Sequence, residues 1–291
     1  MRTITDEHLQ AYQEGGCLQK LFDVIKEDPA LSFEIRMNNK VMIYYHKDRI
    51  LTISYCKGKP SIDTLSEKYY KNATPPTVSF EDGDLIQTLR DKSRLRQYFR
   101  EAKRLVGSYK VGLEFEVQQN IALDNRSFSN RFVVVDMEWQ LPQSDIKKEE
   151  RISRTRIDLV VVDTQKNDKG ENDVYLGELK VGMGAIGGKS GIDDHIKKTN
   201  KFMSNPKACA VLRADVERII RQKAALGLLE GDYAGLNLSD TPRMMLILAY
   251  RGSEEKSALK RQVEKARDEA KAEGMAVPLI VWPNAQNILD V

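Results

Sequence analysis

Cysteine is scarce in this sequence of 291 residues, and its scarcity excludes two classes of small scaffold. The three cysteines, Cys17, Cys56 and Cys209, are widely separated, and none belongs to the CxxC pairs that are typical of structural zinc sites. Their odd number also argues against a disulfide framework. We therefore expect a protein of the reducing cytoplasm.

Long apolar runs and a net charge of one sign are also missing. No stretch approaches the ~18 consecutive apolar residues that indicate a membrane-spanning helix, and the N-terminal sequence MRTITDEHLQ has no apolar core of a signal peptide. The 46 basic residues nearly balance the 43 acidic ones, so the formal net charge is only +3. This balance excludes a histone-like polycation, and any surface that binds an anion must be a local patch. We expect no membrane partner.

What is present is the composition of a globular protein, with 41% hydrophobic and 31% charged residues. The length allows one or two domains. The clearest signal of a domain boundary is the segment Asn72-Ala-Thr-Pro-Pro-Thr77, where Pro75 and Pro76 exclude a helix. We therefore predict a small N-terminal α+β module over residues 1–80 and a larger domain over residues 81–291.

The predicted N-terminal module contains a helix from Ala11 to Lys26 and a β-meander from Leu31 to Cys56. Asn38 and Asn39 separate the first two strands of the meander, and asparagine tolerates the positive φ of a tight turn. The module carries no catalytic constellation. It is expected to serve packing or association, for example as the surface of a homodimer.

The second predicted domain begins with a basic helix from Leu85 to Val106. Its apolar residues recur at helical spacing and form one seam, comprising Leu95, Phe99, Ala102 and Val106. Arg96, Arg100 and Arg104 lie away from this seam. They form either an ordinary solvated face or a surface that binds the phosphates of a nucleic acid, and this helix is a second candidate for a homodimer contact.

The remaining pattern predicts an α/β core around a mixed sheet. The core begins with a helix over Gly112 to Leu123 and three strands, over Arg131 to Gln140, Arg154 to Asp163 and Asp173 to Lys180. Two helices follow, over Ile192 to Met203 and Lys207 to Leu228. The pattern ends with a strand over Met244 to Tyr250, a helix over Glu254 to Glu273 and a strand over Val277 to Trp282.

Three charged residues within these strands indicate chemistry. Asp158 lies inside an otherwise apolar strand, and Glu178 and Lys180 end the next strand on one face, because side chains alternate along a strand. If the two strands pair, Asp158 and Glu178 lie side by side. Burying such carboxylates is costly unless something compensates them. Carboxylate oxygens suit Mg²⁺, which can activate water for phosphodiester hydrolysis. The alternative is that Glu178 and Lys180 form an ordinary structural ion pair with no catalytic role.

With Arg156-Ile-Asp158, Glu178-Leu-Lys180 and the αβββαβ order around them, the sequence resembles the PD-(D/E)xK nuclease superfamily over about residues 112 to 250. The proline that often precedes the motif aspartate is absent. The resemblance implies a restriction-endonuclease-like core and a nuclease that uses Mg²⁺ or Mn²⁺ on nucleic acid, with DNA favoured over RNA. It implies Asp158, Glu178 and Lys180 as catalytic residues. Implied metal ligands are Asp158, Glu178, the backbone carbonyl of Leu179 and a carboxylate of the preceding helix, with Glu114 favoured over Glu116.

The resemblance also implies that polar residues on the helix after the second motif reach the phosphate, and His195 and Lys198 are the candidates. Two other functions remain open. The segment from Met183 to Ser190 approaches the GxxxxGK[ST] pattern of a nucleotide-binding loop, but methionine stands where the first glycine is required. The chain could also be a nuclease-like fold that has lost activity and serves as a nucleic-acid-binding or scaffolding protein.

Overall fold

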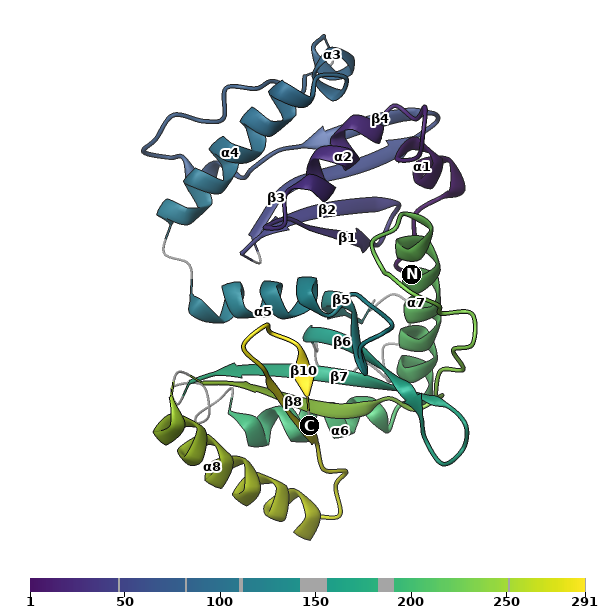
Figure 1. Cartoon of the computed structure of the whole chain (residues 1–291), viewed down its shortest axis with the longest axis vertical. Helices are drawn as coiled ribbons and strands as arrows, with labels where there is room; N and C mark the ends of the chain where they lie inside the picture. The colour runs from purple at the N-terminus through teal and green to yellow at the C-terminus, as the bar shows by residue number, and fades with distance from the viewer. Residues whose placement is uncertain are drawn as a thin grey trace. The chain divides into compact units, whose positions relative to one another are not determined.

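The computed structural model describes residues 1–46, 48–81, 83–109, 112–141, 156–182, 191–250 and 252–290 of the chain. The chain divides into two compact units. The first contains Met1–Gln119 together with Arg221–Gly227, and the second contains Asn120–Ile220 and Leu228–Val291. Each unit combines helices with one β-sheet, which confirms the mixed α/β class expected from the sequence (Figure 1).

The first unit is built on a four-stranded antiparallel sheet with the order β1-β2-β3-β4. Its strands are β1 (Ser32–Arg36), β2 (Lys40–Tyr45), β3 (Asp48–Cys56) and β4 (Lys59–Asp63). Asn38 and Asn39 turn the chain between β1 and β2 with φ values of 61° and 56°. Both values lie in the left-handed region that asparagine tolerates, so the predicted meander and its tight turn are confirmed.

Two details of this region differ from the prediction. The predicted meander ended at Cys56 and did not include the strand β4, which contains Pro60; as an edge strand it accommodates a proline that a central strand would not. The single helix predicted over Ala11 to Lys26 was also wrong. Two helices, α1 (Asp6–Ala11) and α2 (Gln19–Glu27), take its place. A Cβ on Gly16 would lie 2.3 Å from the carbonyl oxygen of Ala11, so the chain reverses where only glycine fits.

The helices α3 (Leu85–Leu89) and α4 (Lys92–Ser108) replace the single helix predicted over this stretch. The break has a local cause. The Asp91 carboxylate accepts hydrogen bonds from the backbone N–H groups of Ser93 at 2.8 Å and Arg94 at 3.2 Å, and therefore starts a new helix. The predicted seam of α4 is confirmed, since all four of its apolar residues are buried.

Contacts of α4 keep it with the sheet that precedes it. The buried Tyr98 hydroxyl donates a hydrogen bond to the Ile50 carbonyl of β3 at 2.5 Å and accepts one from the Leu65 N–H at 2.9 Å. A short 3-10 helix, η1 (Glu67–Tyr69), lies on the connection between β4 and α3. The boundary placed near residue 80 thus falls within the first unit, which continues to Gln119.

The second unit is built on a six-stranded mixed sheet with the order β10-β9-β8-β7-β6-β5. The strands β5, β6 and β7 form an antiparallel meander, whereas β7, β8 and β9 run parallel. The strands are β5 (Phe132–Gln140), β6 (Arg156–Lys166), β7 (Asn172–Val181), β8 (Arg243–Ala249), β9 (Leu279–Pro283) and β10 (Leu289–Asp290). The predicted alternation of helices and strands is confirmed, and the short strand β10 adds to it.

The helices of this part of the chain are α5 (Leu113–Asp124), α6 (Ile192–Met203), α7 (Pro206–Ala225) and α8 (Ser253–Ala272). The first residues of α5 and the last residues of α7 belong to the first unit. One apolar cluster joins α6 and α8 to a face of β8, with Ile192 and Ile196 from α6, Val263 from α8, and Leu246 and Leu248 from β8. This cluster fixes which face of the sheet the two helices cover.

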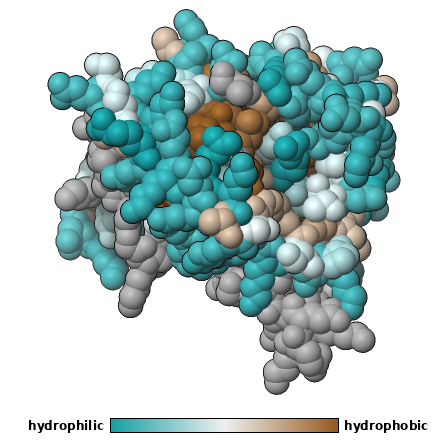
Figure 2. Space-filling model, turned by 90° about the horizontal axis from the view of Figure 1, so that it is seen from below, coloured by the Kyte–Doolittle hydropathy of each residue, from teal (hydrophilic) through white to brown (hydrophobic). Residues whose placement is uncertain are grey.

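Figure 2 shows one face on which polar side chains predominate and apolar side chains gather in a recess. Within the described ranges, no helix combines the length and the apolar character that crossing a bilayer would require. The cysteines Cys17, Cys56 and Cys209 all carry free thiols.

Candidate functional site

Asp158 and Glu178 occupy neighbouring positions on β6 and β7. The antiparallel register pairs Leu159 with Gly177, and one step further along each strand stand Asp158 and Glu178. Both are buried, with exposed fractions of 7% and 9%. A carboxylate oxygen of Asp158 accepts a hydrogen bond from the backbone N–H of Leu179 at 3.1 Å. The expected pairing of the two strands is therefore confirmed, while the catalytic roles of these residues stay predictions.

Glu178 lies between two nitrogen groups. Its Oε1 accepts a hydrogen bond from the Lys180 ammonium at 2.7 Å, and its Oε2 lies 3.1 Å from Nδ1 of His195 on α6. Burial raises the pKa of the Glu178 carboxyl, but the hydrogen bonds and charges of His195 and Lys180 outweigh burial and hold the pKa below its ordinary value. The arrangement therefore favours the charged carboxylate.

Asp158, Glu178 and Lys180, here called the carboxylate cluster, lie on the face of the sheet that α6 and α8 cover. Along the parallel pairing of β7 with β8, Glu178 is opposite Leu246 and Lys180 is opposite Leu248. These two leucines pack against α6 and α8, and side chains paired in register share a face. The carboxyl ends of parallel strands are where open α/β sheets bind ligands, and Lys180 is one residue from the end of β7.

Two helix residues were predicted beside the cluster, and they differ in what they contact. His195 reaches Glu178, as described above. Lys198 instead pairs with Asp194, one turn earlier on α6, at 2.6 Å. Of the two, His195 is the one that the structure brings to the carboxylates.

The predicted carboxylates of α5 and the predicted basic residues of α4 belong to the first unit. Glu114 is half-buried and Glu116 is exposed on α5, and their roles as metal ligands stay predictions. Arg96, Arg100 and Arg104 are exposed on α4. Arg96 binds Glu27 of α2 at 2.6 Å, so part of this basic surface serves an ion pair within the unit. The nucleotide-binding loop considered over Met183 to Ser190 lies outside the described residues.

Comparisons with protein-family models, with curated proteins and with solved structures gave no match. Arg156, which belongs to the Arg156-Ile-Asp158 motif, forms an ion pair with Glu138 of β5 at 2.9 Å, and this makes it a cross-strand partner rather than a free cation.

The chemistry of the donor set fits a hydrated divalent cation. Asp158 and Glu178 supply hard oxygen donors, and Mg²⁺ and Mn²⁺ prefer such ligands and Mg²⁺ keeps several of its waters. In the described parts of the chain, no group of three or more histidine, cysteine, aspartate or glutamate residues is placed to hold a metal ion. A metal held here would therefore rely on water for much of its coordination. The Leu179 carbonyl stays a predicted additional ligand.

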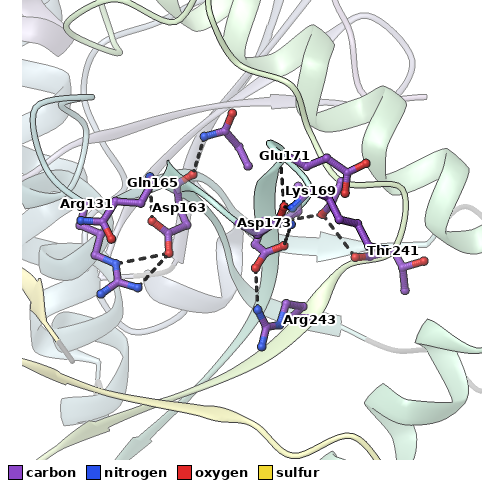
Figure 3. A network of polar contacts seen from close by, with 12 residues as sticks. Arg131, Asp163, Gln165, Lys169, Glu171, Asp173, Thr241 and Arg243 are labelled. Carbon is purple, nitrogen blue, oxygen red and sulfur yellow. Dashed lines mark hydrogen bonds and ion pairs between the residues drawn. The ribbon is translucent and has the colours of Figure 1, made fainter.

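A second polar network occupies the opposite end of the β6–β7 hairpin, and sequence reasoning did not foresee it (Figure 3). Asp173 accepts hydrogen bonds from Asn167 at 2.8 Å and from Arg243 at 2.6 Å. Asp163 is bound by Arg131 at 3.3 Å. Each carboxylate is thus paired with an arginine, and Asp173 accepts a further hydrogen bond from an amide, which is typical of a structural network. The sequence shows an aspartate near the end of each strand, but the arginines that bind these aspartates, Arg131 and Arg243, lie in distant segments of the chain.

Proposed function

We propose that the protein is a nuclease that uses Mg²⁺ or Mn²⁺ to hydrolyse phosphodiester bonds of nucleic acid, with DNA the favoured substrate. The observation that carries this proposal is the burial of Asp158, Glu178 and Lys180 together on one face of two paired strands. Two adjacent carboxylates and an ammonium in a largely apolar sheet are costly to bury unless they are compensated. A divalent cation would compensate both.

The strand and helix order around these residues supports the same proposal. The segment α5-β5-β6-β7-α6-α7-β8 contains the αβββαβ order of a restriction-endonuclease-like core, with the aspartate on the second strand and the Glu-x-Lys sequence on the third. We propose this fold, and membership of the PD-(D/E)xK superfamily, on that order and on the motif residues.

Asp158 and Glu178 would hold the cation, which supplies Lewis-acid polarisation of the phosphate and a more acidic bound water. Lys180, buried beside Glu178, would place its ammonium where negative charge develops on the phosphate. His195 holds Glu178 from the other side and so fixes the direction of that carboxylate. The backbone N–H of Leu179 does the same for Asp158.

A second candidate function is favoured by one observation. Lys180 and His195 already bind Glu178, so the burial of this carboxylate has a structural explanation without a metal. The chain would then be an inactive member of the same fold that binds nucleic acid or acts as a scaffold. Asp158 is the residue that tests the two functions against each other, because the nuclease requires its carboxylate as a metal ligand and the hydrogen bonds that Lys180 and His195 make to Glu178 do not involve it.

The experiment compares Asp158→Asn with Asp168→Asn, a control on the exposed loop between β6 and β7. We expect Mg²⁺ to raise the melting temperature of the parent and of the control but not of Asp158→Asn. Cleavage of plasmid, single-stranded DNA and RNA should fall on the order of 100-fold or more in Asp158→Asn alone. A parent that neither binds Mg²⁺ nor cuts any of the three substrates would favour the inactive protein.

A further inference from the structure

Two aromatic residues that have no role in the proposed catalysis contact each other just beyond the carboxylate cluster of Asp158, Glu178 and Lys180. Tyr250 directly follows β8, and Trp282 lies on β9. Their ring centroids are 5.6 Å apart and their planes are nearly perpendicular, at 73°. The Lys256 ammonium of α8 lies 4.9 Å from the Tyr250 centroid and 5.1 Å from the Trp282 centroid. The cation–π contacts hold the two rings in a defined orientation.

These rings share a face and an end of the sheet with the proposed site. Lys180 is paired with Leu248 on β8, and side chains alternate, so Leu248 and Tyr250 project to the same side. Trp282 packs against the cluster that contains Leu248. Two residues of strand span about 7 Å, and two base steps of a nucleic-acid strand span about the same length.

The start of α8 converges on the same point. Gly182, two residues after Lys180, has a φ of 70°, and a Cβ added to it would lie 2.9 Å from the Glu255 carboxylate of α8. The end of β7 and the first turn of α8 are therefore in direct contact, and Figure 1 shows α8 beginning beside the ends of β7 and β8. The aromatic pair is thus held by three elements next to the cluster.

The chemistry of this surface selects a flat ring rather than a phosphate. Tyr250 is 37% exposed, which is high for a large aromatic side chain at the end of a buried strand. Glu254 and Glu255 directly precede Lys256 in the first turn of α8, and their charges disfavour a phosphate at this point. Aromatic side chains stack on nucleobases of any sequence, because every base has a π face.

We propose that Tyr250, Trp282 and Lys256 form a stacking platform that holds one unpaired nucleobase, so that the preferred substrate is single-stranded or unpaired nucleic acid. This inference rests on the proposed nuclease function. A base held on the platform belongs to the strand whose phosphodiester lies at Asp158, Glu178 and Lys180. Base pairs of an intact duplex present their edges rather than their faces, so a duplex gains nothing from the platform.

The test uses tryptophan fluorescence of the full chain, in Ca²⁺, during titration with single-stranded oligothymidylate. The chain has two tryptophans, and Trp139 is fully buried, so a change on binding reports Trp282. We expect quenching in the parent. Tyr250→Ala should weaken affinity about 5- to 100-fold, as loss of one stacked base does, whereas Tyr250→Phe should bind within about twofold of the parent. Tyr109→Ala, an exposed tyrosine of the first unit, is the matched control.

Two further measurements secure the result. Affinity for a blunt duplex should be equal in the parent and all variants. Lys256→Gln, on the helix surface, should weaken single-strand binding even if Tyr250→Ala fails to fold, because it frees the two rings. Parental affinity of a folded Tyr250→Ala, equal weakening for duplex and single strand, or binding without any fluorescence change would each overturn the platform.

Failure of the platform is distinguishable from failure of the nuclease. If the parent cuts nucleic acid and Tyr250→Ala cuts single strands at the parental rate, the platform is overturned and the nuclease stands. If the parent cuts nothing but Tyr250→Ala loses single-strand affinity, the platform stands as a binding site and the nuclease is overturned.

Discussion

Lys180 has an exposed fraction of 6% and its ammonium lies 2.7 Å from Glu178. A buried cation of this kind can be structural or chemical, and the two roles differ in what its removal does. If the lysine only neutralises Glu178, its loss leaves a buried carboxylate with less compensation, and stability and every function fall together. If it stabilises the transition state, binding survives and turnover is lost.

We expect Lys180→Met to fold, to bind nucleic acid in Ca²⁺ about as well as the parent, and to lose cleavage in Mg²⁺ by on the order of 100-fold or more. Binding and single-turnover cleavage are measured on the same preparation. Lys197→Met is the control, because Lys197 is exposed on α6 and pairs with Glu273 at 3.5 Å. Near-parental cleavage by Lys180→Met would contradict the nuclease proposal.

His8 provides a pH-dependent contribution to the stability of the first unit. It is fully buried between the rings of Tyr12 and Tyr55, with Nδ1 3.1 Å from Asn39 and Nε2 2.9 Å from the Tyr12 hydroxyl. Burial lowers the pKa of His8, and the hydrogen bonds to Asn39 only partly oppose this. The unfolded chain therefore takes up the proton first as pH falls.

The contribution of His8 is present above its ordinary pKa of about 6.5 and is lost as pH falls toward the lower pKa of the folded protein. We expect the melting temperature of the parent to decrease over this range more steeply than that of His8→Gln, which cannot titrate. Thermal unfolding followed by circular dichroism at several pH values measures the difference. Parallel pH profiles of parent and variant would show that His8 is not the titrating group.

At the scale of single elements, the N-terminus of α4 offers a matched comparison. Asp91 accepts two hydrogen bonds from the first turn of α4, whereas Asp84 stands at the same position of α3 and its side chain forms no capping hydrogen bond. Asp91→Ala should reduce the free energy of unfolding by about 1 kcal/mol, and Asp84→Ala by clearly less. Denaturant titrations of the two variants provide the measurement, and equal losses would mean that the cap does not act.

Several elements of the second unit could be predicted because their signal is local. The apolar runs of β6 and β7, and the polar segment between them, specify a hairpin without reference to the rest of the chain. Strand alternation likewise places Glu178 and Lys180 on one face. The breaks between α1 and α2 and between α3 and α4 were missed, because a glycine pair and an N-cap aspartate interrupt patterns that otherwise continue at helical spacing.

The candidate site likewise contains contacts that the sequence could predict and contacts that it could not. Pairing of Asp158 with Glu178 follows from a short hairpin, so the sequence could predict it. For His195 and Lys198 the sequence predicted a reach to the phosphate, because both share a face of the helix, but it did not predict the contact of His195 with Glu178. The meeting of Tyr250 with Trp282 could not be foreseen, because it depends on the order of β8 and β9 in the sheet and on the register between them.

At the scale of the whole molecule, the first unit includes Arg221–Gly227 as well as the N-terminal residues. Lys223 binds the Glu34 carboxylate at 2.8 Å, and both side chains are nearly fully buried. Ser32 donates a further hydrogen bond to Glu34 at 2.7 Å. The two residues are 189 positions apart, so nothing local in the sequence indicates that this lysine pairs with a strand carboxylate.

Lys223→Met should therefore reduce the free energy of unfolding by about 3 kcal/mol, since it leaves Glu34 buried without this partner. The double variant Glu34→Gln with Lys223→Met should recover more than half of that loss, because it removes a buried charge that would otherwise keep only its longer ion pair with Arg36, at 3.7 Å, in place of the Lys223 contact. Chemical denaturation of the parent, both single variants and the double variant completes the cycle. Additive losses would mean that the two residues do not act as a pair.

The mixed pairing of the second sheet also sets an order of events during folding. The strands β5, β6 and β7 pair antiparallel and in sequence, whereas β7 ends at Val181 and its parallel neighbour β8 begins only at Arg243. Closing the longer loop costs more chain entropy, so the meander should form first and β8 should dock later. Pulse-labelled hydrogen exchange should show amides of β6 protected before those of β8. Asp158 and Glu178 would then be paired before Tyr250 and Trp282 meet. A nascent chain would pass through a state that has the two carboxylates but no aromatic surface on which a base could stack.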